Sequence, residues 1–233
     1  IGLFAIVYYK SFFFGRIKRL FMLSHQFTRP FQPDRIRHPR DFQPLAATFW
    51  QQLAIFLEIG AGKGKHALSF ASDNANAHLI AIERTAEKYQ AMQKMANQAK
   101  LSNLTTIHAD AIAWVTHAVP AQSLSGVFIL YPNPEPHNPN QRWLNMPFFE
   151  WLLSRLKPDG ELIVASNIES YIDEAEHKAQ TVWQVPVEKT QVPNHSERTH
   201  FEVNYLARGE ACWQLSIKKP HGYTTRFDDF NSF

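Results

Sequence analysis

From residue 55 onward, short runs of apolar residues alternate with longer stretches in which apolar residues recur every three or four positions. The short runs have the length of buried β-strands, and the longer stretches have the period of helices that bury one face. The expected strands are Ile55–Ile59, His78–Ile82, Leu104–His108, Gly126–Leu130, Glu161–Ala165 and Ala211–Ile217. The expected helices are Lys65–Ser72, Thr85–Lys100, Phe148–Leu156 and Ser170–Thr181, with a short helix near Leu45–Leu53.

This alternation predicts an α/β fold with a doubly wound, mostly parallel sheet. Parallel strands need a crossover connection, and a helix is the usual one. In such sheets ligands bind beyond the carboxyl ends of the strands. The loops that follow the strands are therefore where the chemistry of this protein is expected.

A glycine-rich loop follows the first expected strand. Its glycines, Gly60, Gly62 and Gly64, are spaced G-x-G-x-G, which matches neither the dinucleotide-binding fingerprint nor the phosphate-binding P-loop. Glu58 lies two residues before the first glycine, where a carboxylate repels a pyrophosphate and attracts a cationic amino group. Glycines let a ligand approach the backbone closely. The loop therefore favours a ligand that carries an ammonium group.

Two further acids follow the next two strands. Glu83 ends the second strand, where a carboxylate can accept both hydroxyls of a ribose. Asp110 follows the third strand, where it can accept from an adenine amino group. A ligand with ammonium, ribose and adenine groups matches S-adenosylmethionine (SAM). Any one of the acids can be a solvated loop residue, but all three in register with the glycine loop favour a SAM site.

A proline-rich segment follows the fourth strand and holds Asn133 between Pro132 and Pro134. Proline fixes the backbone angle φ and removes a donor, so the segment is expected to be stiff and to present the asparagine at low entropic cost. A plain proline-rich loop is the alternative. Amino-methylating enzymes present an Asn-Pro or Asp-Pro motif to a base from this position, which makes Asn133 the candidate catalytic residue.

These motifs resemble the tRNA (guanine-N7-)-methyltransferase family, over a stretch from about residue 56 to residue 215. The matching segments are Leu57–Gly62, Glu83, Asp110-Ala111, Tyr131–Glu135, Ser166-Asn167 and Thr199–Glu202 with Arg208-Gly209 behind it. The resemblance implies the class I (Rossmann-like) methyltransferase fold, SAM as cofactor and tRNA as partner. The implied cofactor contacts are Glu58, Gly60, Gly62, Gly64, Glu83, Asp110, Ala111 and Asn133. The implied substrate contacts are His137, Asn167, Thr199 and Glu202.

Four positions depart from the family's motifs. Asn133 and Asn167 replace two aspartates, Glu135 replaces a tryptophan, and His137 replaces a lysine. An amide offers one acceptor and two donors where a carboxylate only accepts, so the departures bear on the choice of base and not on the fold. The leading hypothesis is methyl transfer to N7 of a tRNA guanine, whose free lone pair needs no deprotonation. A methyltransferase for another base or a small amine, and a non-catalytic RNA-binding relative, stay open.

The charge distribution separates a basic N-terminal segment from the rest of the chain. Eight Lys and Arg against two Asp give the first 50 residues a formal charge of +6, so the remainder carries −3. We expect a basic arm over residues 1–50, of which residues 22–50 contact RNA, a methyltransferase domain over 51–218 and a C-terminal tail over 219–233. Residues 1–21 are expected to lie outside the natural protein, with translation starting at Met22. The apolar stretch Ile1–Tyr9 is too short to span a bilayer, and no stable membrane association is expected.

The histidines and the cysteine indicate no metal centre. Cys212 is the single cysteine, which excludes an internal disulfide and a Cys-based cluster and favours a reducing, cytoplasmic location. His195 and His200 lie five residues apart, without a third ligand at a recognisable spacing. The sequence leaves the oligomeric state open.

Overall fold

A seven-stranded sheet is the centre of the structure, which is a computed structural model that describes residues 28–51 and 54–230. The strand order is β3-β2-β1-β4-β5-β7-β6, and in the described part of the chain β7 alone runs opposite to the other strands of the sheet. The strands are β1 (Ile55–Ile59), β2 (His78–Glu83), β3 (Leu104–His108), β4 (Leu124–Leu130), β5 (Leu156–Ser166), β6 (Val187–Gln191) and β7 (Trp213–Lys218). The predicted α/β fold with a doubly wound, mostly parallel sheet is confirmed.

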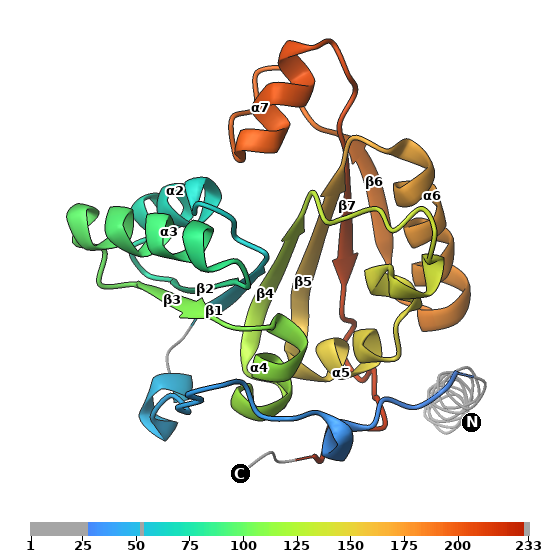
Figure 1. The fold of residues 1–233 in the computed structure, drawn as a ribbon. Helices are drawn as coiled ribbons and strands as arrows, with labels where there is room; N and C mark the ends of the chain where they lie inside the picture. The colour runs from blue at the N-terminus through green and yellow to red at the C-terminus, as the bar shows by residue number, and fades with distance from the viewer. Residues whose placement is uncertain (1–27, 52–53, 231–233) are drawn as a thin grey trace, which may run out of the picture.

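Helices cover both faces of the sheet (Figure 1). They are α2 (Lys65–Asp73), α3 (Ala86–Ala99), α4 (Ala111–Ala118), α5 (Phe148–Arg155), α6 (Glu169–Lys178) and α7 (His200–Ala207). Short 3-10 turns occupy Pro33–Arg35, Ala47–Gln51, Pro139–Gln141 and Trp143–Asn145, and a π-helical turn, Ala179–Trp183, extends α6. Figure 1 shows α7 apart from these layers, beyond the upper ends of β4 and β5.

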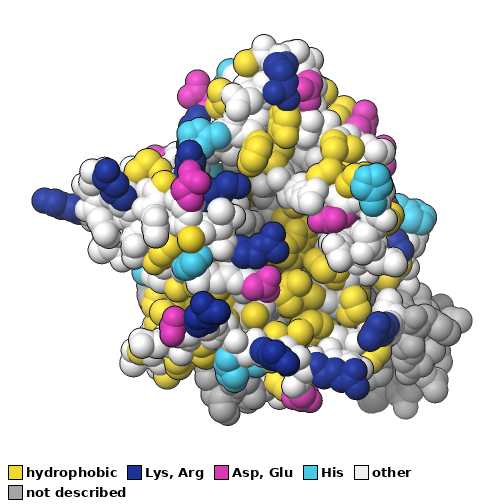
Figure 2. All heavy atoms as spheres, in the orientation of Figure 1, with side chains coloured by type: hydrophobic (Ala, Val, Ile, Leu, Met, Phe, Trp, Pro, Cys, Tyr) yellow, Lys and Arg dark blue, Asp and Glu magenta, His cyan; other side chains and the backbone are white. Residues whose placement is uncertain are grey.

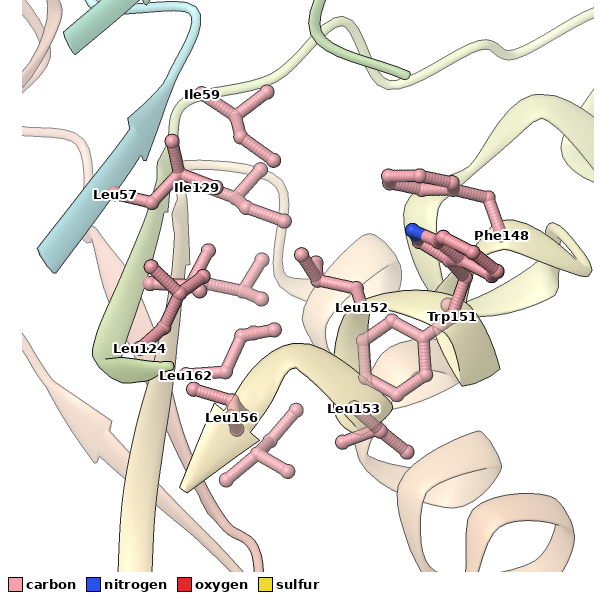
Figure 3. Close-up of a cluster of buried hydrophobic side chains, with 14 of the residues drawn as sticks. Leu57, Ile59, Leu124, Ile129, Phe148, Trp151, Leu152, Leu153, Leu156 and Leu162 are labelled. Carbon is pink, nitrogen blue, oxygen red and sulfur yellow. The ribbon is translucent and has the colours of Figure 1, made fainter. Parts of the chain in front are cut away.

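The larger core lies between the sheet and the helices α4, α5 and α6. Figure 3 shows Leu57 and Ile129 of the sheet opposite Trp151 and Leu152 of α5, and these side chains are at most 1% exposed. A smaller core beneath α2 and α3 includes Met92. Two unequal cores are expected where strand residues alternate between the two covered faces of a sheet.

Two helices and one strand of the described chain were not predicted from the sequence. The helix α4 is almost uniformly apolar, so it carries no helical period, although Asp110 caps it by accepting from the backbone N–H of Ala113 at 3.0 Å. The strand β6 lies at the sheet edge, is polar and is mostly exposed, which weakens the hydrophobic signal. The helix α7 begins at the motif that ends in Glu202, and Thr199 caps it through its hydroxyl, which accepts from the backbone N–H of Glu202 at 3.0 Å.

The segment after β7 contributes to the core. The buried guanidinium of Arg155 donates to the carbonyl of Phe227 at 2.7 Å and to that of Val119 at 3.0 Å. Phe31, from the described part of the expected arm, packs with its ring centroid 5.6 Å from that of Trp151. Both ends of the described chain are therefore fastened to the same side of the domain.

Most of the expected basic arm lies outside the described residues. In the part that is described, the carbonyl of Ile36 accepts from His117 at 2.8 Å, at the end of α4 that lies away from the glycine loop. The exposed side chains of Arg35, Arg37 and Arg40 belong to this stretch. None of the helices in the described ranges is long and apolar enough to cross a membrane.

Candidate functional site

The glycine loop after β1 leaves its backbone open. Gly60, Gly62 and Gly64 all have positive φ, which side chains disfavour. A Cβ added at Gly60 or Gly62 would meet nothing within 4 Å, whereas a Cβ at Gly64 would lie 2.5 Å from Cγ of Met92 on α3. The first two glycines therefore leave room for a ligand, and the third lets α2 pack closely against α3.

Glu83 is fixed between the glycine loop and the start of α3. The residue is 6% exposed, and its carboxylate accepts from the backbone N–H of Gly62 at 2.9 Å and from that of Thr85 at 2.7 Å. A carboxylate has about four acceptor positions, so two remain for ligand hydroxyls. Asp110 follows β3 and is exposed, with one oxygen used to cap α4. Ala111 is the first residue of that helix.

Glu58 faces α2 and is buried. Its carboxylate oxygen lies 3.0 Å from Nδ1 of His66, in the first turn of that helix. The ring centroid of His66 lies 4.7 Å from that of Phe128, on the strand beside β1. The structure therefore gives Glu58 a neighbour that the sequence did not indicate, and its expected contact with a ligand ammonium group stays a prediction.

The proline segment after β4 is a strained, braced loop. Tyr131 and Glu135 have positive φ values of 53° and 46°, which are uncommon for residues with side chains and recur at functional sites. The exposed Asn133 between them donates from Nδ2 to Oε1 of Glu135 at 2.8 Å. The guanidinium of Arg142 donates to the carbonyl of Pro134 at 2.9 Å.

Arg142 also fastens this loop to α6. Its guanidinium forms an ion pair with Glu174 and lies 5.7 Å from the centroid of the Tyr171 ring. Arg142 is the only Lys or Arg between residues 131 and 143, and its side chain braces the loop. His137 is exposed and lies in a turn of the same loop.

Glu202 is buried at the base of α7 and is surrounded by donors. Tyr131 donates its hydroxyl at 2.6 Å, Arg198 donates from its guanidinium at 2.8 Å, and the hydroxyl of Ser196 donates as well. Burial raises the pKa of the Glu202 carboxyl, but the hydrogen bonds from Arg198, Ser196 and Tyr131 outweigh it and hold the pKa below its usual value. The carboxylate therefore anchors α7 to the loop after β4.

Asn167 follows β5 and is paired in the same way as Asn133. Its Nδ2 donates to Oε2 of Glu210 at 2.7 Å, and Arg208 forms an ion pair with the same carboxylate. The amide of Asn167 and the guanidinium of Arg208 lower the pKa of Glu210. Each asparagine that replaces a family aspartate thus has a glutamate beside it, which motif comparison alone did not show.

The predicted site residues meet at one edge of the sheet. Along the order of the strands, Asp110 follows β3, Glu83 ends β2, and Gly60, Tyr131 and Asn167 follow β1, β4 and β5. Figure 2 shows a hollow at this place, between α2 and α3, α7 and the loop after β4, with hydrophobic and charged side chains around it. In the described ranges, no three His, Cys, Asp or Glu side chains gather where they could hold a metal ion.

The sheet topology and the glycine loop define a class I, Rossmann-like methyltransferase fold. The structure resembles the 16S rRNA methyltransferase KamB, with a TM-score of 0.56 and 15% identity, over 77% of this chain and 96% of that one. It also resembles a methyltransferase from Pyrococcus furiosus, with a TM-score of 0.55 and 14% identity, over 71% and 75% of the two chains. At these identities the likeness shows the fold alone.

The chain belongs to the family Methyltransf_4, described as putative methyltransferase, whose model matches residues 52–215. The tRNA (guanine-N(7)-)-methyltransferase of Nitrosospira multiformis is 28% identical over 187 residues, which are 76% of this chain and 80% of the relative. That of Thiobacillus denitrificans is 25% identical over 213 residues, which are 88% and 89% of the two chains. The family resemblance that the motifs indicated is confirmed.

Proposed function

We propose that this protein transfers a methyl group from SAM to N7 of a guanine in tRNA. One structural observation carries the proposal. The open backbone at Gly60 and Gly62, with Glu83 beside it, lies on the same sheet edge as the braced loop that presents Asn133. The relatives named as tRNA guanine-N7 methyltransferases support the choice of substrate.

The residues at the sheet edge fit SAM. The free acceptor positions of Glu83 suit ribose hydroxyls, and the exposed oxygens of Asp110 suit an adenine amino group. The space over Gly60 and Gly62 admits the rest of the molecule against the backbone. When bound there, SAM supplies a methyl group that its sulfonium already activates.

Methylation of guanine N7 requires no proton transfer by the protein before the methyl group is transferred. The N7 lone pair is free, so no general base is required, and catalysis depends on alignment and on the charges around the base. Asn133 has one amide N–H on Glu135 and a second that can donate to the guanine O6. The carboxylate of Glu135 keeps acceptor positions for the N1–H and the 2-amino group. The carboxylate oxygens of Glu202 already accept from three side chains. Glu135 is therefore the better candidate to accept from the N1–H and the 2-amino group of guanine.

A methyltransferase for another base or a small amine is the second candidate. The specific observation behind it is that Asn133 and Asn167 stand where the family has aspartates, and that each amide is committed to a neighbouring glutamate. An amide can turn to offer its oxygen to an amino group, as adenine or cytosine would require.

Nucleoside mass spectrometry separates the two candidates. The purified protein is incubated with isotope-labelled SAM and tRNA that lacks base methylation, and the RNA is digested. Label in 7-methylguanosine is the expected result, and Asn133→Ala should reduce it. Asn140→Ala, an exposed asparagine of the same loop, is the matched control and should keep the rate. Label in adenosine or cytidine would establish the second candidate, and no label in any nucleoside would overturn the proposal.

A further inference from the structure

A row of three aromatic rings leads from the base of the site into solvent. The ring centroids of Tyr131 and Tyr205 lie 5.7 Å apart, and those of Tyr205 and Phe201 lie 6.2 Å apart. Phe201 and Tyr205 are four positions apart on α7 and so share one face of that helix. Their ring planes are within 18° of parallel. The row begins at Tyr131, two residues before Asn133.

The outer ring of this row is exposed. Among the residues that the structure describes, Phe201 and Ile168 are the large hydrophobic side chains that stand exposed, at 50% and 36%. Both lie at the carboxyl end of the sheet, since Ile168 follows β5 and Phe201 is in α7. Phe201 is not required to attach the helix, because the buried Glu202 already joins α7 to Tyr131 at the end of β4.

The outer two rings of the row are nearly parallel, whereas Tyr131 is tilted by 40° from Tyr205. The guanidinium of Arg208 lies 4.9 Å from the ring centroid of Tyr205 and is paired with Glu210. Two rings on a helix of eight residues offer far less surface than the roughly 800 Å² that each partner buries in a stable protein interface. They match the size of one nucleobase, and unpaired bases of RNA stack on aromatic side chains and guanidinium planes.

We propose that Phe201 and Tyr205 form a stacking platform for an unpaired base of the RNA substrate, next to the base presented to Asn133. This inference rests on the proposed action on RNA and names the surface that holds the substrate beside the reacting base. Stacking selects poorly among bases, because every base has a flat face. The platform therefore positions the RNA, and the choice of the methylated base stays with the loop after β4.

The test uses two replacements of Phe201 in the full chain. Phe201→Leu keeps an apolar side chain but removes the ring, and Phe201→Tyr keeps the ring. The probes are tRNA and a single-stranded RNA that carries 2-aminopurine, whose fluorescence falls when it stacks. Phe201→Leu should weaken binding of both RNAs about tenfold or more and abolish the quenching, while Phe201→Tyr binds within about twofold of the natural protein. The salt dependence of binding should stay unchanged, because stacking releases no counterions.

Ile168→Ala is the matched control, since it also removes an exposed apolar side chain at this end of the sheet. It should bind RNA like the natural protein. The platform would be contradicted if Phe201→Leu and the natural protein bound RNA with equal affinity. It would also be contradicted if neither protein bound RNA. An altered oligomeric state with unaltered RNA affinity would also overturn it, because the surface would then dock a second copy of the chain.

Methyl transfer to tRNA, measured on the same proteins, separates this inference from the proposed function. If the natural protein methylates tRNA guanine and Phe201→Leu binds RNA normally, the platform fails and the function stands. If the natural protein methylates no guanine but Phe201→Leu loses RNA affinity, the function fails and the platform stands.

Discussion

The hydroxyl of Tyr131 donates a hydrogen bond of 2.6 Å to the carboxylate of Glu202, across 71 positions of the chain. Tyr131 begins the loop that presents Asn133, and Glu202 lies in the first turn of α7. Burial, with Cys212 and Glu202 close by, raises the pKa of Tyr131, so the phenol stays a donor at every physiological pH. The helix α7 therefore positions the loop after β4, although the two segments are far apart in the sequence.

Tyr131→Phe should reduce the rate of methyl transfer about tenfold and leave SAM affinity within about twofold. A hydrogen bond to a charged group contributes about 1.5–3 kcal/mol, and its loss frees the loop without touching the glycine loop. Turnover on tRNA and calorimetric titration with SAM measure the two quantities. A turnover equal to that of the natural protein would show that the hydrogen bond does not position Asn133.

Glu202→Gln should change how stability depends on pH. The carboxyl has a lower pKa in the folded protein than in the unfolded chain, where it is about 4.3. Its stabilisation is therefore complete well above that value and is lost as the pH falls through the folded pKa, because the unfolded state binds the proton first. The variant should be less stable at pH 7 by about 1.5–3 kcal/mol, the order expected when charge-assisted hydrogen bonds are lost from a partly buried ion pair with Arg198.

Urea denaturation of Glu202→Gln and the natural protein from pH 7 to pH 3 gives the measurement. The difference between the two free energies of unfolding should shrink toward the acid end. Two parallel curves would contradict the assigned role of the carboxylate.

Gly62→Ala and Gly64→Ala should fail in different ways, although both positions have positive φ. The Cβ at Gly62 points into open space, so this variant should fold with a modest cost of about 1 kcal/mol and lose SAM affinity. The Cβ at Gly64 collides with Met92, so that variant should lose clearly more stability. Thermal melts with and without SAM distinguish the two. Equal melting temperatures and equal SAM affinities would contradict the division of roles.

Glu83→Ala should weaken SAM binding about tenfold or more. It removes the charged hydrogen bonds proposed to the ligand ribose and the two observed bonds from the backbone of Gly62 and Thr85. Glu87→Ala, an exposed acid in the first turn of α3, is the matched control and should bind SAM normally. Calorimetric titration provides the comparison. An unchanged affinity of Glu83→Ala would remove this residue from the cofactor site.

Neutralising Arg35, Arg37 and Arg40 tests whether RNA reaches the far end of the domain. The three side chains are exposed beyond the end of α4, on the opposite side from α7. If they contact phosphates, the triple variant should bind tRNA more weakly, and the slope of log affinity against log salt should fall by about 0.7–0.9 for each lost contact. An unaltered slope would confine the RNA to the carboxyl end of the sheet.

The sequence by itself determined the α/β class, the positions of the strands β1 to β4 and the acids and glycines at their ends. Apolar runs of strand length are local signals, and the positive φ of Gly60 is a local requirement that glycine satisfies. The resemblance added the roles of the motifs. The helix α4 could have been found from the Asp110 cap, because capping is also local.

Only the tertiary structure decided which side chains the site residues meet. The pairs of Glu58 with His66, Asn167 with Glu210, and Tyr131 with Glu202 join different elements of the fold. No periodicity or spacing encodes such a contact, because it exists only once the elements have packed. The same holds for the aromatic row on α7, whose first ring comes from the end of β4 and whose other two come from a helix that the sheet topology brings beside it.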